Sequence, residues 1–106
     1  MAGATEPGDR AGGWTFLTNH AHVLLVLARQ PDARMRDVAA TVGVTERAVQ
    51  AIVADLEAGG YLTRSRTGRR NHYTVNRAGR FRHPAEADHQ VGELLALFAG
   101  DEAGEG

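Results

Sequence analysis

The sequence predicts one small domain that is mainly α-helical and carries a single β-hairpin, an α+β fold. Apolar residues recur at helical spacing in four segments, at about 14–30, 35–42, 45–58 and 84–98. Gly43 separates the second helical segment from the third, and Gly59 and Gly60 end the third. Two runs rich in Tyr, Thr and Val, at 61–66 and 70–76, flank a turn at Thr67, Gly68 and Arg69, which predicts the hairpin.

Length and composition favour one folded domain at 14–99, because the chain has 106 residues, of which 42% are apolar and 24% charged. No apolar run approaches the roughly 20 residues that cross a bilayer. The N-terminal residues lack the basic and apolar regions of a secretion signal. We therefore expect a cytoplasmic protein without a membrane segment. Residues 1–13 and 100–106 are rich in Gly, Ala and acidic residues, which predicts disordered tails.

The first and last helical segments carry more apolar surface than one small core covers. Residues 21–28 are apolar around most of a helical circumference, so a core on one side and a second subunit on the other would bury them. The last helix is predicted to begin at Pro84, in the first-turn position that proline favours. Both helices are expected to form a homodimer interface. Its predicted residues are Leu17, Leu24, Val91, Leu94, Leu95 and Phe98.

The third helical segment presents one apolar face and one face of short or polar side chains. Thr45 is a favourable N-cap for it, and Glu46 suits its first turn. At 100° per residue, the apolar face consists of Val49, Ile52, Val53 and Leu56, and the opposite face of Arg47, Gln50, Ala51 and Ala54.

Charge is segregated along the chain, although the formal net charge is only −1. Residues 60–83 contain seven arginines and no acidic residue, whereas residues 84–106 contain six acidic residues and no arginine. A basic hairpin beside a pair of helices indicates a surface for a polyanion, with DNA the expected one. The arginines of the basic block are Arg64, Arg66, Arg69, Arg70, Arg77, Arg80 and Arg82.

The run DVAATVGVTERAVQAIVADLEAGGYLTRSRTGRRNHYTV, residues 37–75, resembles the winged helix-turn-helix of bacterial regulators, the class that contains the MarR and ArsR families. The signature positions include Ala39, Gly43, Val49, Leu56 and Gly60. The resemblance covers roughly 14–98 and looks closest to small actinobacterial MarR-like regulators. It implies a homodimeric, sequence-specific DNA-binding transcription regulator that is not an enzyme.

The resemblance implies that helix 45–58 enters the major groove and that hairpin 61–76 lies on the backbone or in the minor groove. Arg47 suits guanine, Gln50 suits adenine, and Thr45 or Glu46 suits a phosphate or cytosine. Arg36 either contacts phosphate or pairs with Asp32 or Asp37. No acidic residue near the hairpin in the sequence is available to pair with its arginines. The predicted DNA contacts are Arg36, Thr45, Glu46, Arg47, Gln50, Ala51, Arg64, Arg66, Arg69, Arg70 and His72.

Other kinds of site have little support in the sequence. There is no cysteine, and the histidines lack the i, i+3 or i, i+4 spacing of a helical metal site, so we predict no metal and no cofactor. No phosphate-binding loop or nucleophile motif indicates catalysis. A regulator that responds to a metal or small molecule has no positive sign in the sequence. The weakly basic face of helix 45–58 and the acidic last helix favour another alternative. That alternative is a winged-helix adaptor that binds a protein, such as a sigma factor or another regulator.

Overall fold

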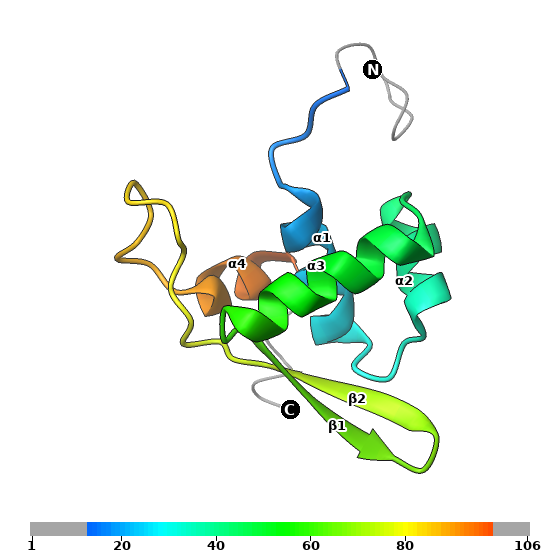
Figure 1. Cartoon of the computed structure of the whole chain (residues 1–106). Coiled ribbons are helices and arrows are strands. Elements are labelled where there is room, and N and C mark those ends of the chain that lie inside the picture. The colour runs from blue at the N-terminus through cyan, green and yellow to red at the C-terminus, as the bar shows by residue number, and fades with distance from the viewer. Residues whose placement is uncertain (1–12, 99–106) are drawn as a thin grey trace.

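The computed structural model of the chain describes residues 13–98 and contains four helices and one hairpin. The elements in chain order are α1 (Asn19–Arg29), α2 (Met35–Val42), α3 (Glu46–Ala58), β1 (Leu62–Thr67), β2 (Arg70–Val75) and α4 (Val91–Phe98). In Figure 1, α3 crosses the front of the molecule and the hairpin projects below it. The predicted mainly α-helical fold with one hairpin is confirmed. No helix in the described residues is long and apolar enough to cross a membrane.

Helix α1 lies at the centre of the fold, in contact with α2, α3, β2 and α4. Thr18 caps it, since the Thr18 hydroxyl accepts a hydrogen bond from the backbone N–H of Ala21 at 3.1 Å. The helix therefore begins at Asn19, five residues later than the predicted start. These neighbours bury or half-bury residues 21–28 within one copy of the chain, so the apolar circumference of α1 does not by itself require a second subunit. Leu24, assigned to that interface, is only 4% exposed.

Helices α2 and α3 form the predicted helix-turn-helix. Gly43 ends α2 with a φ of 89°, a left-handed conformation that glycine adopts without steric cost. The Thr45 hydroxyl accepts a hydrogen bond from the backbone N–H of Ala48 at 3.0 Å, which confirms Thr45 as the N-cap of α3.

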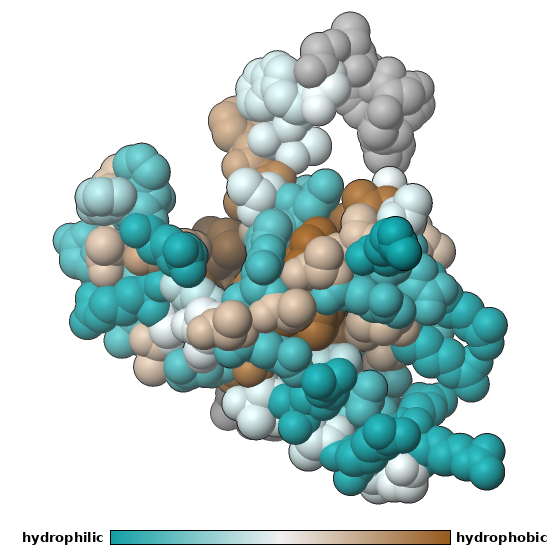
Figure 2. All heavy atoms as spheres, in the orientation of Figure 1, coloured by the Kyte–Doolittle hydropathy of each residue, from teal (hydrophilic) through white to brown (hydrophobic). Residues whose placement is uncertain are grey.

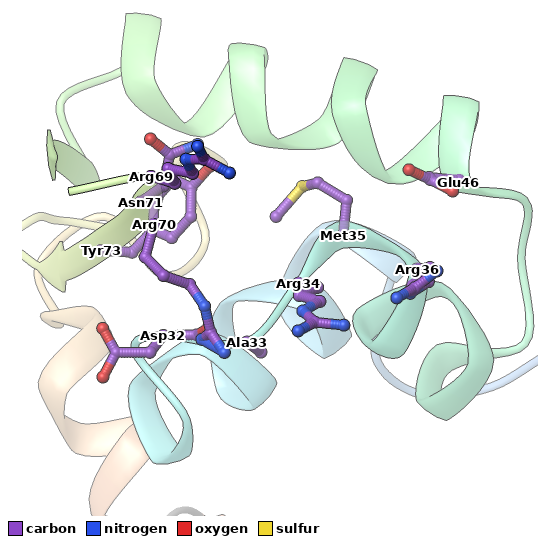
Figure 3. Close-up of a pocket in the computed structure, with 10 residues that line it drawn as sticks. All are labelled: Asp32, Ala33, Arg34, Met35, Arg36, Glu46, Arg69, Arg70, Asn71 and Tyr73. Atoms are coloured by element: carbon purple, nitrogen blue, oxygen red, sulfur yellow. The ribbon is translucent and has the colours of Figure 1, made fainter. Parts of the chain in front are cut away.

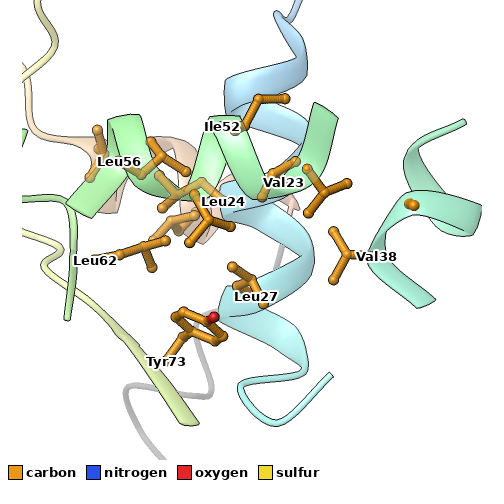
Figure 4. Close-up of a cluster of buried hydrophobic side chains, with 13 residues drawn as sticks. Val23, Leu24, Leu27, Val38, Ile52, Leu56, Leu62 and Tyr73 are labelled. Atoms are coloured by element: carbon orange, nitrogen blue, oxygen red, sulfur yellow. The ribbon is translucent and has the colours of Figure 1, made fainter. Parts of the chain in front are cut away.

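The hairpin pairs β1 with β2 in an antiparallel register that runs from Leu62 opposite Val75 to Thr67 opposite Arg70. Gly68 and Arg69 thus form a two-residue turn. Only Gly68 of these two has a positive φ, 62°, which is the pattern of a type II′ turn. The hairpin is attached to the body at its base, where Leu62 and Tyr73 are buried against the helices (Figure 4).

Helix α4 begins at Val91, so the predicted start at Pro84 was wrong. Before it, the chain pairs with an earlier segment: the backbone N–H of Phe81 donates to the His89 carbonyl at 3.2 Å, and that of Val91 to the Gly79 carbonyl at 2.8 Å. These contacts occupy backbone groups that a longer helix would need. At the new start, the Glu93 carboxylate accepts from the backbone N–H of Gln90 at 3.1 Å, as in a capping box.

The same carboxylate binds His89, with 2.8 Å between Nδ1 of the ring and Oε1 of Glu93. This hydrogen bond, together with the negative charge of Glu93, raises the pKa of His89 above its ordinary value. The backbone N–H of Gln90 and the His89 ring in turn lower the pKa of Glu93. The start of α4 is thus held by polar contacts rather than by proline.

The hydrophobic core surrounds α1 (Figure 4). Val91 and Leu95 of α4 belong to it, at 4% and 0% exposure, so these two predicted interface residues lie in the core of the chain itself. Leu17 and Leu94 are half-buried, and Phe98 is 56% exposed. The predicted tails fall outside the described residues, apart from Gly13.

Replacing Leu95 by Ala tests whether α4 is part of the fold. We expect the free energy of unfolding to fall by about 2–5 kcal/mol, because the substitution removes fully buried methyl groups and leaves a cavity. Leu97→Ala makes the same chemical change at a side chain that is 75% exposed within one copy, and it serves as the matched control at a protein concentration where both variants are monomeric. Urea denaturation at one low protein concentration measures both. Equal losses for the two variants would contradict the packing of α4 against α1.

Candidate nucleic-acid interface

The outer face of α3 is open to solvent. Its inner face buries Val49, Ile52, Val53 and Leu56 in the core, and this packing turns the opposite face outward. The exposed side chains there include the predicted Glu46, Arg47, Gln50 and Ala51. Ala54 and Ala58 are also exposed, which makes the surface along α3 less hydrophilic than the hairpin beside it (Figure 2). Such a face, with few long side chains, can approach a partner surface closely.

The hairpin carries five predicted contact residues, and the structure divides them into two groups. Arg66 and Arg69 are exposed and form no hydrogen bond or ion pair with any of the described residues. Arg64, Arg70 and His72 instead bind groups of the helical body. The sequence places no acid within the hairpin, but folding brings Glu57 to Arg64 and Asp32 to His72, so the expectation that the hairpin arginines are all free was wrong for Arg64 and Arg70.

The first of these contacts joins β1 to the end of α3. The Nε atom of Arg64 lies 3.2 Å from Oε2 of Glu57, in the last turn of the helix. In the strand register, Arg64 lies opposite the buried Tyr73, so its side chain is on the hairpin face that packs toward the helices. The ion pair thus braces the hairpin against α3.

The second set of contacts joins β2 to the turn between α1 and α2. Nδ1 of His72 lies 2.7 Å from Oδ1 of Asp32, and Nη1 of Arg70 donates to the Asp32 carbonyl oxygen at 3.1 Å. The backbone N–H of Tyr73 also donates to the Pro31 carbonyl oxygen at 2.9 Å. Asp32 is forty residues away from His72 along the sequence, so local sequence could not have revealed this pairing.

A groove of about 480 Å³ brings part of the predicted site together. It lies between the start of α2, the first residue of α3 and the tip of the hairpin (Figure 3). Arg36, Glu46, Arg69 and Arg70 all line it. Arg36 pairs with neither Asp32 nor Asp37, so the alternative of a local ion pair is not realised. Arg34, which was not among the predicted contacts, lines the groove as well.

A second, larger hollow of about 980 Å³ lies between the start of α1, the end of α3 and α4. Its walls include Phe16, Leu17 and Leu94. Large apolar side chains are strongly exposed near the two ends of the described chain, because no other part of the same copy packs over them. These side chains are Trp14, Phe16, Leu97 and Phe98, at 67%, 91%, 75% and 56% exposure.

Comparison with known proteins identifies the architecture. The sequence profile of the MarR family matches residues 15–71. The structure is similar to the crystal structure of MepR, a transcription regulator of the Staphylococcus aureus multidrug efflux pump MepA, with a TM-score of 0.51 and 22% sequence identity. The match covers 58% of this chain and 48% of that one, so the chain spans about half the length of MepR. No curated protein sequence matches the chain. The predicted winged helix-turn-helix fold is thereby confirmed.

Arg64→Ala and Arg66→Ala test the division between braced and free arginines. Loss of Arg64 removes the ion pair with Glu57, and an exposed pair contributes about 0.2–1 kcal/mol. We therefore expect the hairpin amides to exchange their hydrogens roughly 1.5 to 5 times faster, by local opening. Arg66→Ala removes an equal charge without a partner and should leave exchange unchanged. The division is wrong if both variants alter exchange alike.

Proposed function

The chain belongs to the MarR family, and we propose that it is a sequence-specific DNA-binding transcription regulator that acts as a homodimer. The observation that carries this proposal is the pairing of two exposed surfaces on one side of the molecule. Glu46, at the start of the outer face of α3, and Arg69, at the tip of the hairpin, line one groove between these two surfaces (Figures 1 and 3). Family membership also favours regulation over catalysis.

In this proposal, the outer face of α3 reads bases in the major groove. Arg47 has the forked donors that suit the O6 and N7 atoms of guanine, and Gln50 matches the N6 and N7 atoms of adenine. Ala51 keeps the helix close to the base edges and suits a thymine methyl group. Glu46 accepts from a cytosine amine at the start of the helix. The Thr45 hydroxyl accepts from Ala48 and can still donate its own proton to a phosphate.

The hairpin supplies contacts that do not depend on sequence. The side chains of Arg66 and Arg69 bind no other described residue and are suited to phosphates or to the minor groove. Arg64 acts mainly by holding the hairpin to α3, and Arg70 and His72 by holding it to the turn before α2. Only two of the five predicted hairpin residues are therefore proposed as primary DNA contacts.

A homodimer would present two α3 helices to half-sites about 10 base pairs apart, one turn of the duplex. Exposed apolar side chains at both ends of the described chain support this assembly, because burying them between two copies removes them from water. We assign the interface to Phe16, Leu17, Leu94, Leu97 and Phe98. Leu24, Val91 and Leu95 of the predicted interface contribute only through the core that holds these residues in place.

The alternative of a protein-binding adaptor draws on the same exposed apolar residues, Trp14 and Phe16 above all. It would require a partner protein that binds in stoichiometric amount, with no salt-dependent binding to DNA. A cytoplasmic, nucleoid-associated location follows from the DNA-binding proposal and is refuted if the protein binds no DNA.

The first test is binding to random and genome-derived duplexes by fluorescence anisotropy at about 50 and 200 mM salt. The affinity should fall steeply with salt, because each arginine–phosphate contact releases counterions and contributes about 0.9 to the slope of log K against log salt. Arg66→Ala combined with Arg69→Ala should flatten this slope by about 2 per protomer on every sequence. Gln50→Ala should instead weaken the preferred sequence alone, by about 1–3 kcal/mol.

Arg29→Ala is the matched control for charge, because Arg29 is an exposed arginine at the end of α1 that lines neither the groove nor the hairpin. For this variant, the slope of log K against log salt should equal that of the unmodified protein. Absence of binding at about 50 mM salt, where phosphate contacts are strong, would refute the DNA-binding proposal. Equal effects of Gln50→Ala on preferred and random duplexes would refute sequence reading by α3.

The assembly is tested by sedimentation equilibrium of the full chain and of Leu97→Asp. The unmodified protein should sediment as a dimer, and the variant as a monomer, because a carboxylate cannot be buried unpaired in an apolar contact. Ala40→Asp adds the same charge at an exposed position of α2 and should leave the dimer intact. A monomeric native protein, or a dimeric Leu97→Asp variant, would contradict the assignment.

A further inference from the structure

The groove between α2 and the hairpin is lined by more positive charge than either element provides alone. Arg34 and Arg36 come from the start of α2, and Arg69 and Arg70 from the tip of the hairpin (Figure 3). Two carboxylates, those of Asp32 and Glu46, also line it, which leaves a formal balance of 4 − 2 = +2. The positive charge of the groove therefore depends on the tertiary fold.

Most of the arginine donors in this groove are available to a ligand. The side chains of Arg34, Arg36 and Arg69 form no hydrogen bond or ion pair with the described residues. Arg70 uses Nη1 to bind the Asp32 carbonyl oxygen, which leaves the other nitrogens of its guanidinium group. The Asp32 carboxylate is bound by His72, so one of the two negative groups is already engaged.

The two pairs of arginines are held at a fixed separation. The contacts of Arg70, His72 and Tyr73 attach β2 to Pro31 and Asp32, which directly precede α2. Pro31 and Asp32 lie just before Arg34 and Arg36 in the sequence, and Arg70 follows Arg69 directly. The contacts between these segments therefore fix the two pairs of arginines relative to each other. A site assembled before its ligand arrives loses less conformational entropy on binding.

We propose that this groove is a phosphate-binding seat, which the structure forms before any ligand is bound. Guanidinium groups bind phosphate through paired N–H donors, and arginine is better suited to this geometry than lysine. The start of α2 adds to the attraction: Arg34, its N-cap, makes no side-chain capping hydrogen bond, and the helix dipole favours an anion there. Of the two carboxylates that line the groove, that of Glu46 has no side-chain partner among the described residues.

The inference rests on the proposed function in one respect, since the DNA backbone between the grooves contacted by α3 and the hairpin is the expected source of the phosphate. A free oligophosphate offers the same chemistry and would compete with DNA for the seat. The two sources are separated by experiment, one arm with duplex DNA and the other with pyrophosphate alone.

In the DNA arm, Arg34→Ala combined with Arg36→Ala is compared with Arg29→Ala by fluorescence anisotropy on one duplex. We expect the double variant to lose at least roughly tenfold in affinity, since hydrogen bonds between charged partners are lost. The slope of log K against log salt should fall by about 0.9 for each phosphate contact removed. The control should retain both the affinity and the slope. Circular dichroism verifies that the exposed substitutions leave the fold intact.

In the second arm, pyrophosphate is titrated into the unmodified protein, and the NMR signals of the arginine Nε–Hε groups are followed. Binding at the seat should shift the signals of Arg34, Arg36 and Arg69, while that of Arg29 stays in place. A response in the DNA arm supports a backbone phosphate as the ligand, and a response to pyrophosphate supports a free oligophosphate. The seat is refuted if the double variant equals the control on DNA and pyrophosphate shifts none of the groove arginines.

The failure of this inference and that of DNA binding are distinguishable. If the unmodified protein binds no DNA, the regulator proposal fails, and the pyrophosphate arm still tests the seat. If DNA binding persists unchanged without Arg34 and Arg36, while pyrophosphate shifts none of the groove arginines, the seat fails and the regulator proposal stands.

Discussion

The packing of α3 against α1 is the contact on which the rest of the structure depends. Val49, Ile52, Val53 and Leu56 are buried in the core around α1, and their burial fixes the rotation of α3 about its own axis. Because that rotation is fixed, the side chains on the opposite face point to solvent together. The same core receives Tyr73 of the hairpin, so the orientation of α3 and the attachment of the hairpin depend on one set of apolar contacts.

Polar contacts then determine which basic side chains remain available to a ligand. Glu57 engages Arg64, and Asp32 with its neighbour Pro31 holds β2. These braces lower the number of free charges on the hairpin but define where the remaining ones lie relative to α2 and α3. A hairpin without these contacts would offer more unpaired arginines to a ligand, but its position relative to α2 and α3 would be less fixed. For recognition of a regular polyanion, the fixed geometry matters more, because it avoids ordering the hairpin during binding.

Local patterns were sufficient to predict the elements whose ends depend on nearby residues. Gly43 and Thr45 set the turn and the start of α3 through contacts within four residues, and both positions were predicted correctly. The start of α4 was not, since pairing of His89 and Val91 with the segment around Gly79 competes with a longer helix. The contacts of Asp32 with His72 and of Glu57 with Arg64 were missed because each joins two different elements of the fold. Apolar content alone also could not separate the core residue Leu95 from the exposed Leu97.

The central claim is that α3 and the hairpin tip contact one DNA duplex together, and the backbone amide NMR spectrum tests it most directly. On titration with a duplex that the protein binds, the amide signals of Arg47 to Ala54 and those of Gly68 and Arg69 should shift along one binding curve. The signals of α4 should move little. Shifts confined to the region of Phe16 and Leu97, with α3 and the hairpin unaffected, would contradict the account.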